Sequence, residues 1–260
     1  MGERTKYAPG AFSWTDLTTT DQPAAKQFYS ELFGWTAVDN PIGDDMVYSM
    51  MQIEGKDVGA ISPQMQAQRD AGAPPTWNSY VTVESADAAA DRATKLGANV
   101  MAPAFDVFDA GRMTVIQDPQ GAFFMPWEPK QHIGASLVNV PGAMAWNELA
   151  SPDPDASAEF YRELFGWQTE PMEAAGGMPY LVIKTSDGHM NGGIRAAMEN
   201  EPSYWLVYFG ADDIDARLAE AGELGGTALV GATDIGMGKI GVVQDPQGAV
   251  FALFAGQFDD

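Results

Sequence analysis

An internal repeat constrains the fold of this chain more than any other feature. The segment QDPQGAFF at residues 117–124 returns as QDPQGAVF at residues 244–251, and FYSELFGW at residues 28–35 returns as FYRELFGW at residues 160–167. The second FY segment follows the first by 132 residues (28 to 160), and the second DPQG segment follows by 127 (117 to 244). Matched segments at nearly equal offsets predict two tandem homologous domains of about 120 residues each.

The acidic composition narrows the range of partners. The chain carries 36 Asp and Glu against 14 Lys and Arg, a formal net charge of -22. Such a charge repels phosphate backbones and anionic lipid surfaces. We therefore expect no nucleic-acid partner and no membrane partner, and we interpret the charge mainly as a source of solubility.

Cysteine content and the N-terminal segment bear on location. The chain contains no cysteine, which excludes disulfides, thiolate metal sites and cysteine nucleophiles. The segment MGERTKYAPG at residues 1–10 lacks the apolar core of a signal peptide, and no apolar run approaches the length of a membrane span. These features predict a cytoplasmic protein.

Capping and turn residues divide both halves into the same elements. A helix is expected to begin at Asp21, with Pro23 in its first turn, and to end at Gly34, and Asp153 and Pro154 begin its counterpart. The other elements expected in the first half are strands at residues 11–18, 47–53, 56–61, 77–83, 99–101, 113–117 and 122–127, a loop at 64–75 and a helix at 87–96. This order predicts an α+β fold of two tandem domains, residues 11–128 and 143–256, each a pair of βαβββ units, with a linker at 129–142.

Both repeated motifs have a sufficient structural explanation. Phe28 and Tyr29 recur with Leu32 at helical spacing, which favours a core-facing stripe. In DPQG the Asp accepts backbone hydrogen bonds, the Pro fixes φ and the Gly supplies a positive φ, so this segment predicts a turn. Neither motif requires a catalytic role.

A wider set of motifs carries a family resemblance. The set comprises the strand starts WTDL and WNEL at residues 14–17 and 146–149, the FYxxLFGW helices, DAGR at 109–112, the DPQGA turns and the linker segment QHIGASLVN at 131–139. With these motifs the chain resembles the vicinal oxygen chelate superfamily, also called the glyoxalase, bleomycin-resistance and extradiol-dioxygenase group. It is most similar to a two-domain actinobacterial branch labelled glyoxalase-like or hydroxylase, which includes a mycobacterial culture-filtrate antigen. The resemblance implies half-open clefts in which His, Glu or Gln side chains hold a divalent metal.

The metal ligands of the superfamily are missing at the matching positions. Carried over by position, the ligand sites fall at Trp14, Asn78 and Met125 in the first domain, and at Trp146, Leu206 and Ala252 in the second. Only two histidines occur, His132 in the linker and His189 in a Ser-Asp-Gly-His turn, and we interpret both as structural or solvated. We therefore expect no metal cofactor.

Strand alternation predicts which side chains line the clefts, because residues two apart in a strand share a face. The predicted lining is Phe12, Trp14, Asp16, Thr18, Asn78, Tyr80, Phe123, Met125 and Trp127 in the first domain, and Met144, Trp146, Glu148, Leu206 and Tyr208 in the second. Each cleft would be an aromatic box with one acid, Asp16 or Glu148. Arg112 and Lys239, at matched positions beside the clefts, could hold an anionic ligand, although such residues are more often surface cations or partners of the nearby Asp109 and Asp234.

These predictions support several hypotheses of function. The first is a metal-independent protein that binds a small aromatic or amphipathic molecule, as in the bleomycin-resistance arm. The second is an enzyme, a glyoxalase-like lyase or a hydroxylase or dioxygenase, in which Asp16 and Glu148 transfer protons. The third is a protein that acts through its surface. The residues equally allow Trp14 and Trp146 to plug a vestigial metal site, and they leave open whether the chain forms a homodimer.

Overall fold

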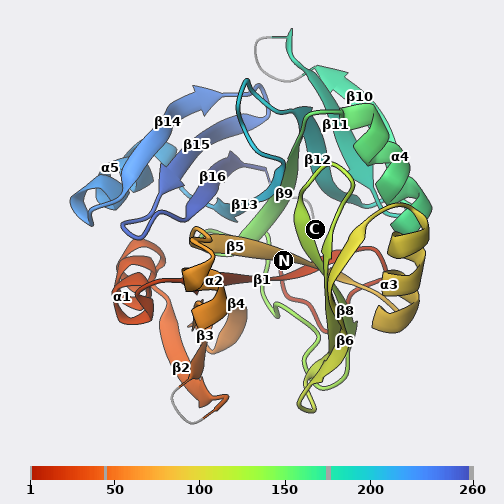
Figure 1. The fold of residues 1–260 in the computed structure, drawn as a ribbon. Helices are drawn as coiled ribbons and strands as arrows, with labels where there is room; N and C mark the ends of the chain where they lie inside the picture. The colour runs from red at the N-terminus through yellow and green to blue at the C-terminus, as the bar shows by residue number, and fades with distance from the viewer. Residues whose placement is uncertain (1, 44–45, 174–176, 258–260) are drawn as a thin grey trace.

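Two eight-stranded sheets form the framework of the protein (Figure 1). The computed structural model describes residues 2–43, 46–173 and 177–257. Within these residues one sheet is built from the N-terminal half and the other from the C-terminal half, which confirms the predicted α+β fold of two tandem domains. No helix in the described ranges is long and apolar enough to cross a membrane.

The first half supplies two successive βαβββ units. Its elements are β1 (Phe12–Thr19), α1 (Gln22–Phe33), β2 (Thr36–Pro41), β3 (Val47–Ile53), β4 (Lys56–Pro63), α2 (Gln66–Asp70), β5 (Thr76–Thr82), α3 (Ala86–Lys95), β6 (Asn99–Val107), β7 (Gly111–Gln117) and β8 (Phe123–Pro129). The strand order is β2-β3-β4-β1-β5-β8-β7-β6, with β1 antiparallel to β5 at the centre. The two units of one half therefore pair with each other.

The second half repeats this order. Its elements are β9 (Met144–Ser151), α4 (Pro154–Phe165), β10 (Gln168–Glu173), β11 (Pro179–Lys184), β12 (Met190–Ala196), β13 (Tyr204–Gly210), α5 (Ile214–Glu223), β14 (Thr227–Asp234), β15 (Gly238–Gln244) and β16 (Val250–Gly256). The sheet order β10-β11-β12-β9-β13-β16-β15-β14 matches the first sheet strand for strand.

The helix boundaries follow from the predicted caps. The Asp21 side chain accepts a hydrogen bond of 3.1 Å from the backbone N–H of Ala24, and Gly34 ends α1 with a φ of 71°. Asp153 and Gly166 do the same for α4. The segment predicted as a loop at residues 64–75 contains the short helix α2. At its N-terminus the Gln68 side chain accepts a hydrogen bond from the backbone N–H of Met65.

The two sheets turn their helix-covered faces, here called the inner faces, toward each other. Helix α1 lies beside α5 and α3 lies beside α4 (Figure 1). Between the helices the rings of Trp77 and Phe209 meet across the interface with centroids 4.9 Å apart. One hydrophobic core therefore runs through both domains, and the opposite, outer face of each sheet points away from its partner domain.

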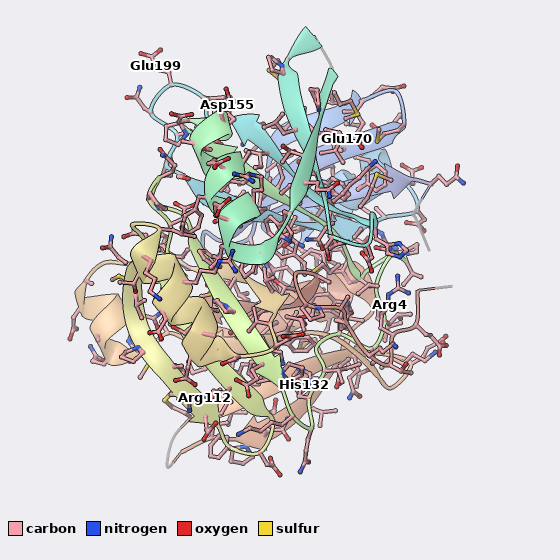
Figure 2. The ribbon with its side chains drawn as sticks, turned by 90° about the vertical axis from the view of Figure 1, so that its right-hand side faces the viewer. Arg4, Arg112, His132, Asp155, Glu170 and Glu199 are labelled. Carbon is pink, nitrogen blue, oxygen red and sulfur yellow. The ribbon has the colours of Figure 1, made fainter. Side chains whose placement is uncertain are left out.

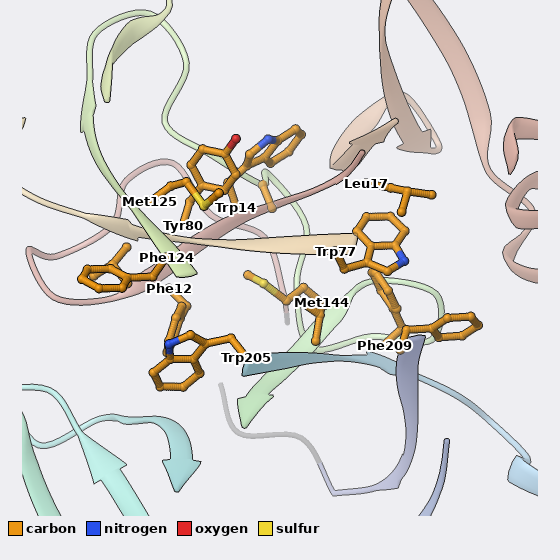
Figure 3. Packing of buried hydrophobic residues seen from close by; sticks show 14 of the residues in the cluster. Phe12, Trp14, Leu17, Trp77, Tyr80, Phe124, Met125, Met144, Trp205 and Phe209 are labelled. Carbon is orange, nitrogen blue, oxygen red and sulfur yellow. The ribbon is translucent and has the colours of Figure 1, made fainter. Parts of the chain in front are cut away.

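Two residues predicted for the clefts lie on the inner faces instead. The pairing of β1 with β5 shifts register between Phe12 and Trp14, and the pairing of β9 with β13 shifts between Met144 and Trp146. Such a bulge adds one residue to a strand, so the alternation of faces is reset. Figure 3 shows Phe12 and Met144 on the opposite side of the strands from Trp14. The prediction was wrong for Phe12 and Met144.

Candidate functional site

The outer face of the first domain carries a hydrogen-bonded cluster around Asp16. Its Oδ2 accepts bonds from the hydroxyls of Tyr48 at 3.0 Å and Tyr80 at 2.9 Å, and its Oδ1 accepts one from the amide of Asn78 at 2.8 Å. The indole N–H of Trp14 donates to the hydroxyl of Tyr48 at 3.0 Å. All three of these donors to the Asp16 carboxyl group are neutral, so these hydrogen bonds stabilise it without a cationic partner.

Burial governs the protonation of this cluster. It raises the pKa of Asp16 above the ordinary value of 3.8, although the hydrogen bonds from Asn78 and the two tyrosines oppose the shift. Burial and the nearby Asp16 charge raise the pKa of Tyr48 and of Tyr80 well above 10. Both hydroxyls therefore stay protonated as donors, and the carboxyl group of Asp16 holds its proton more tightly than a solvent-exposed aspartate does.

The second domain repeats the cluster around Glu148. The indole N–H of Trp146 donates to the hydroxyl of Tyr180 at 2.9 Å, and the hydroxyls of Tyr180 and Tyr208 bond to Glu148. Trp146, Glu148 and Tyr180 each lie 132 residues after their counterparts Trp14, Asp16 and Tyr48. The acid, the two tyrosines and the tryptophan are thus a repeated structural unit.

An arginine distinguishes the second cluster from the first. Arg195 donates from Nε to Glu148 at 2.8 Å, and its other guanidinium nitrogens bond to both oxygens of Glu201 at 2.7 and 2.6 Å. The carboxylates are largely buried, each side chain being 11% exposed. Ser62 occupies the matching place on β4, since Ser62 pairs with Thr18 as Arg195 pairs with Ala150. Among the described residues, the second acid is therefore paired with a cation and the first is not.

Arg112 and Lys239 do not lie at the clusters. Arg112 bonds Asp87 on α3 at 2.7 Å and approaches Asp106 at 3.4 Å, so it lies on the helix-covered side of the sheet (Figure 2). Lys239 bonds Asp215 on α5 at 3.1 Å. The prediction that Arg112 lies beside the cleft was wrong, and Arg112 pairs with Asp87 and Asp106 instead of Asp109. Lys239 also lies opposite Asp234 in the pairing of β14 with β15, and its bond to Asp215 and the charge of Asp234 both raise the pKa of Lys239.

The two histidines have different surroundings. His189 has an exposed side chain, 3.9 Å from Asp187. His132 lies edge-on to Trp14 and to Trp127, with ring centroids 4.6 and 6.0 Å apart. Its Nε2 atom is buried without a hydrogen-bond partner in the described structure, and burial lowers its pKa. His132 therefore packs over the first cluster as a neutral ring.

The outer face of the first domain is filled by its own side chains. Trp14 is 3% exposed, Tyr80 7% and Met125 8%. Two surface hollows lie elsewhere. One, of about 260 Å³, is lined by Pro154, Asp155, Pro179, Leu181, Ile194 and Ala196, and the other, of about 380 Å³, is lined by Asp212, Asp213, Ile214, Asp215, Asp234, Gly236, Gly238, Lys239 and Ala255. The aromatic box predicted for the first domain is a packed cluster in this structure.

Both halves match known families. Residues 11–125 match the Glyoxalase/Bleomycin resistance protein/Dioxygenase superfamily, and residues 146–254 match the Glyoxalase-like domain. The chain therefore belongs to the glyoxalase, bleomycin-resistance and dioxygenase superfamily, as its motifs predicted.

Two relatives align over almost the whole chain. A protein of Mycobacterium tuberculosis named "Putative glyoxylase CFP32" is 44% identical over 97% of this chain and 97% of its own length. The anthracycline biosynthesis protein DnrV of Streptomyces peucetius is 32% identical over 96% of this chain and 94% of its own length. Both alignments therefore span the two domains of this chain.

Solved structures show the same fold at low sequence identity. A Mn(II)-bound glyoxalase from Novosphingobium aromaticivorans superimposes with a TM-score of 0.67 and 15% identity, over 97% of this chain and 85% of that one. The 2,3-dioxygenase LapB from Pseudomonas sp. KL28 gives a TM-score of 0.67 and 14% identity, over 97% and 94%. These likenesses establish the architecture.

The side chains at the carried-over ligand positions do not fit a divalent metal. The indole N–H of Trp14 is engaged with Tyr48, and the Asn78 amide nitrogen donates to Asp16 and to Thr18. Indole, thioether and aliphatic side chains supply no hard oxygen or imidazole donor. In the described part of the chain, no three or more His, Asp or Glu side chains form a group that could hold a metal ion.

Sequence reasoning missed part of both clusters. Tyr48 and Tyr180 bridge the acid to the tryptophan, and their 132-residue spacing was a signal that could have found them. Arg195 and Glu201 carry no such signal, because the arginine has no counterpart in the first repeat. For the predicted residues that the structure does bring together, ligand binding stays a prediction.

Proposed function

We propose that the protein binds a small planar aromatic or amphipathic molecule on an outer face of its sheets, without the divalent metal of its superfamily. The observation that carries this proposal is the repeated unit of tryptophan, two tyrosines and an acid, in which the tryptophan of each domain stands at one of the carried-over metal positions. Aromatic side chains with polar tips provide stacking area together with hydrogen bonds for a ligand of this kind.

The relatives support a polycyclic aromatic ligand. The name of DnrV assigns that protein to anthracycline biosynthesis. An anthracycline has a flat ring system that can stack on tryptophan and a protonated amine that suits an acidic protein. Doxorubicin, a soluble anthracycline, is therefore a suitable first probe.

The binding test uses fluorescence titration with doxorubicin. The double variant Trp14→Ala, Trp146→Ala should weaken binding by more than tenfold. Phe108→Ala, which removes an exposed ring elsewhere, is the control and should leave affinity unchanged. Wild-type affinity in the double variant would remove the outer faces from consideration.

The metal-independent part of the proposal is tested separately. Untagged protein, grown with added manganese, iron, nickel and zinc, should contain less than one tenth equivalent of each by mass spectrometry. A His tag must be absent because it would supply imidazoles. A stoichiometric metal would overturn this part and favour the glyoxalase or dioxygenase chemistry of the superfamily.

The raised pKa of Asp16 supports a second candidate function, proton transfer in an enzyme of the superfamily. Its substrates would be hemithioacetals of methylglyoxal, or aromatic compounds oxidised with uptake of oxygen. If the wild type turns over either class of substrate and the double variant Asp16→Asn, Glu148→Gln does not, this function would rank first. Absence of turnover with both classes would leave binding as the function.

A further inference from the structure

We infer that the two outer faces are not equivalent: the linker closes the first through His132, and the second takes the ligand, a planar aromatic molecule that is neutral or cationic. This inference rests on the proposed function and assigns it to one domain and one class of ligand.

The closure of the first face is built from direct contacts. The His132 ring lies against Trp14 with centroids 4.6 Å apart. The indole N–H of Trp127 donates to the His132 carbonyl at 2.9 Å, and the backbone N–H of His132 donates to the carbonyl of Ala110 at 3.0 Å. The tryptophans beneath are 3% and 5% exposed. A ligand therefore cannot reach Trp14 while His132 stays in place.

The linker that carries His132 is anchored to the sheet. The N–H of Ala135 donates to the Ser13 carbonyl of β1 at 2.7 Å, and the hydroxyl of Tyr7 donates to the Ala135 carbonyl at 2.7 Å. A Cβ added at Gly134 would lie 2.2 Å from the Ser13 oxygen, so this close approach requires glycine. The linker is thus a fixed part of the first domain.

The second face is more open. Of the seven tryptophans, Trp146 is half-buried and the other six are no more than 5% exposed. Within the described residues the Trp146 ring stacks on no other ring, whereas the Trp14 ring packs edge-on against the His132 ring. The residues Leu206, Tyr208 and Ala252 form a small cluster apart from the main core, with half-buried Trp146 and Tyr204 packed against it. The counterparts Trp14, Tyr80 and Met125 belong to the main core.

The charges on the second face define the class of ligand. Glu148 and Glu201 face a single Arg195, which leaves one net negative charge. Arg195 directs four of its five N–H donors to these two carboxylates and to the carbonyl of Ala196, so an anionic ligand would have to compete with them for the guanidinium. Uncompensated carboxylate charge attracts a cation and repels an anion. The face therefore suits a flat ring bearing an amine.

Acrylamide quenching tests the difference between the faces without a ligand. Quenching of the wild type should come almost entirely from Trp146 and should disappear in Trp146→Phe. His132→Ala should add a second quenched population, which Trp14→Phe in that background removes. Quenching that survives in Trp146→Phe would overturn the assignment of the open face.

Calorimetry with doxorubicin tests the binding site. We expect one site in the wild type, a tenfold or greater loss in Trp146→Ala, two sites in His132→Ala, and a return to one in His132→Ala, Trp14→Ala. Anthraquinone-2-sulfonate, a flat anion, should bind at least tenfold more weakly. Circular dichroism checks that every variant is folded.

The other outcomes are distinguishable. Binding that persists in Trp146→Ala overturns the inference but leaves the proposed function standing. No binding in any variant overturns both. A concentration-dependent dimer by sedimentation that shields Trp146 from acrylamide would identify a second copy of the chain as the occupant and also overturn the inference.

Discussion

The hydroxyl of Tyr29 donates a hydrogen bond of 3.0 Å to Oδ2 of Asp245, across the interface between the domains. The reciprocal bond joins Tyr161 to Asp118 at 2.9 Å. The FY motif of each repeat thus meets the DPQG motif of the other. This pairing gives both motifs a role in holding the two domains together.

Removing one of these hydroxyls should weaken the interface. Tyr29→Phe deprives buried Asp245 of a donor and the indole N–H of Trp77 of its acceptor, 2.9 Å away. We expect a loss of about 1.5–3 kcal/mol in the free energy of unfolding, the range for hydrogen bonds to charged groups. Urea unfolding measures it. The distant Tyr161→Phe should cost as much, and additivity in the double variant would show that the two bonds act independently.

The protonation of Asp16 should be visible as a pH dependence of stability. Its folded-state pKa is raised, so the folded protein holds this proton more tightly than the unfolded chain. Its contribution is complete below about pH 4 and is lost as pH rises through the raised pKa. The free energy of unfolding of the wild type relative to Asp16→Asn should therefore decline with increasing pH. Urea unfolding at several pH values measures this difference, and parallel curves would contradict the prediction.

Arg195 should matter far more than a surface arginine. Arg195→Met leaves Glu148 and Glu201 largely buried without a cation, which should cost about 3 kcal/mol. Arg112→Met is the matched control, because its partners Asp87 and Asp106 are exposed, and it should cost less than about 1 kcal/mol. If Arg195→Met and Arg112→Met lost equal stability in thermal or urea unfolding, burial of the second cluster would not increase the cost of removing its cation.

The close approach of the linker to β1 can be tested at Gly134. Gly134→Ala places a methyl group against the Ser13 carbonyl at a φ of 110°, so the linker must shift and His132 with it. We expect a loss of more than about 2 kcal/mol, beyond the cost of a positive φ alone, together with increased acrylamide quenching. Gly188→Ala, with a positive φ but open space around it, should cost about 1 kcal/mol and leave quenching unchanged.

Local chemistry made much of the fold predictable. Asp21 and Gly34 delimit α1 because capping and a left-handed terminal residue depend on neighbouring backbone alone. The face shared by Trp14 and Asp16 followed from strand alternation. That rule failed at Phe12, since a bulge depends on how β1 registers with β5, and a single strand does not encode its partner's register.

The sequence by itself determined the duplication, the four βαβββ units and the family, because these follow from residue identity and short-range spacing. The tertiary structure alone decided the rest. It brought Tyr29 to Asp245 over 216 residues, joined Arg195 to Glu148, and laid His132 on Trp14 in one domain while leaving Trp146 half-buried in the other. These contacts depend on how the two sheets and the linker pack together, and such long-range packing leaves no local pattern in the chain.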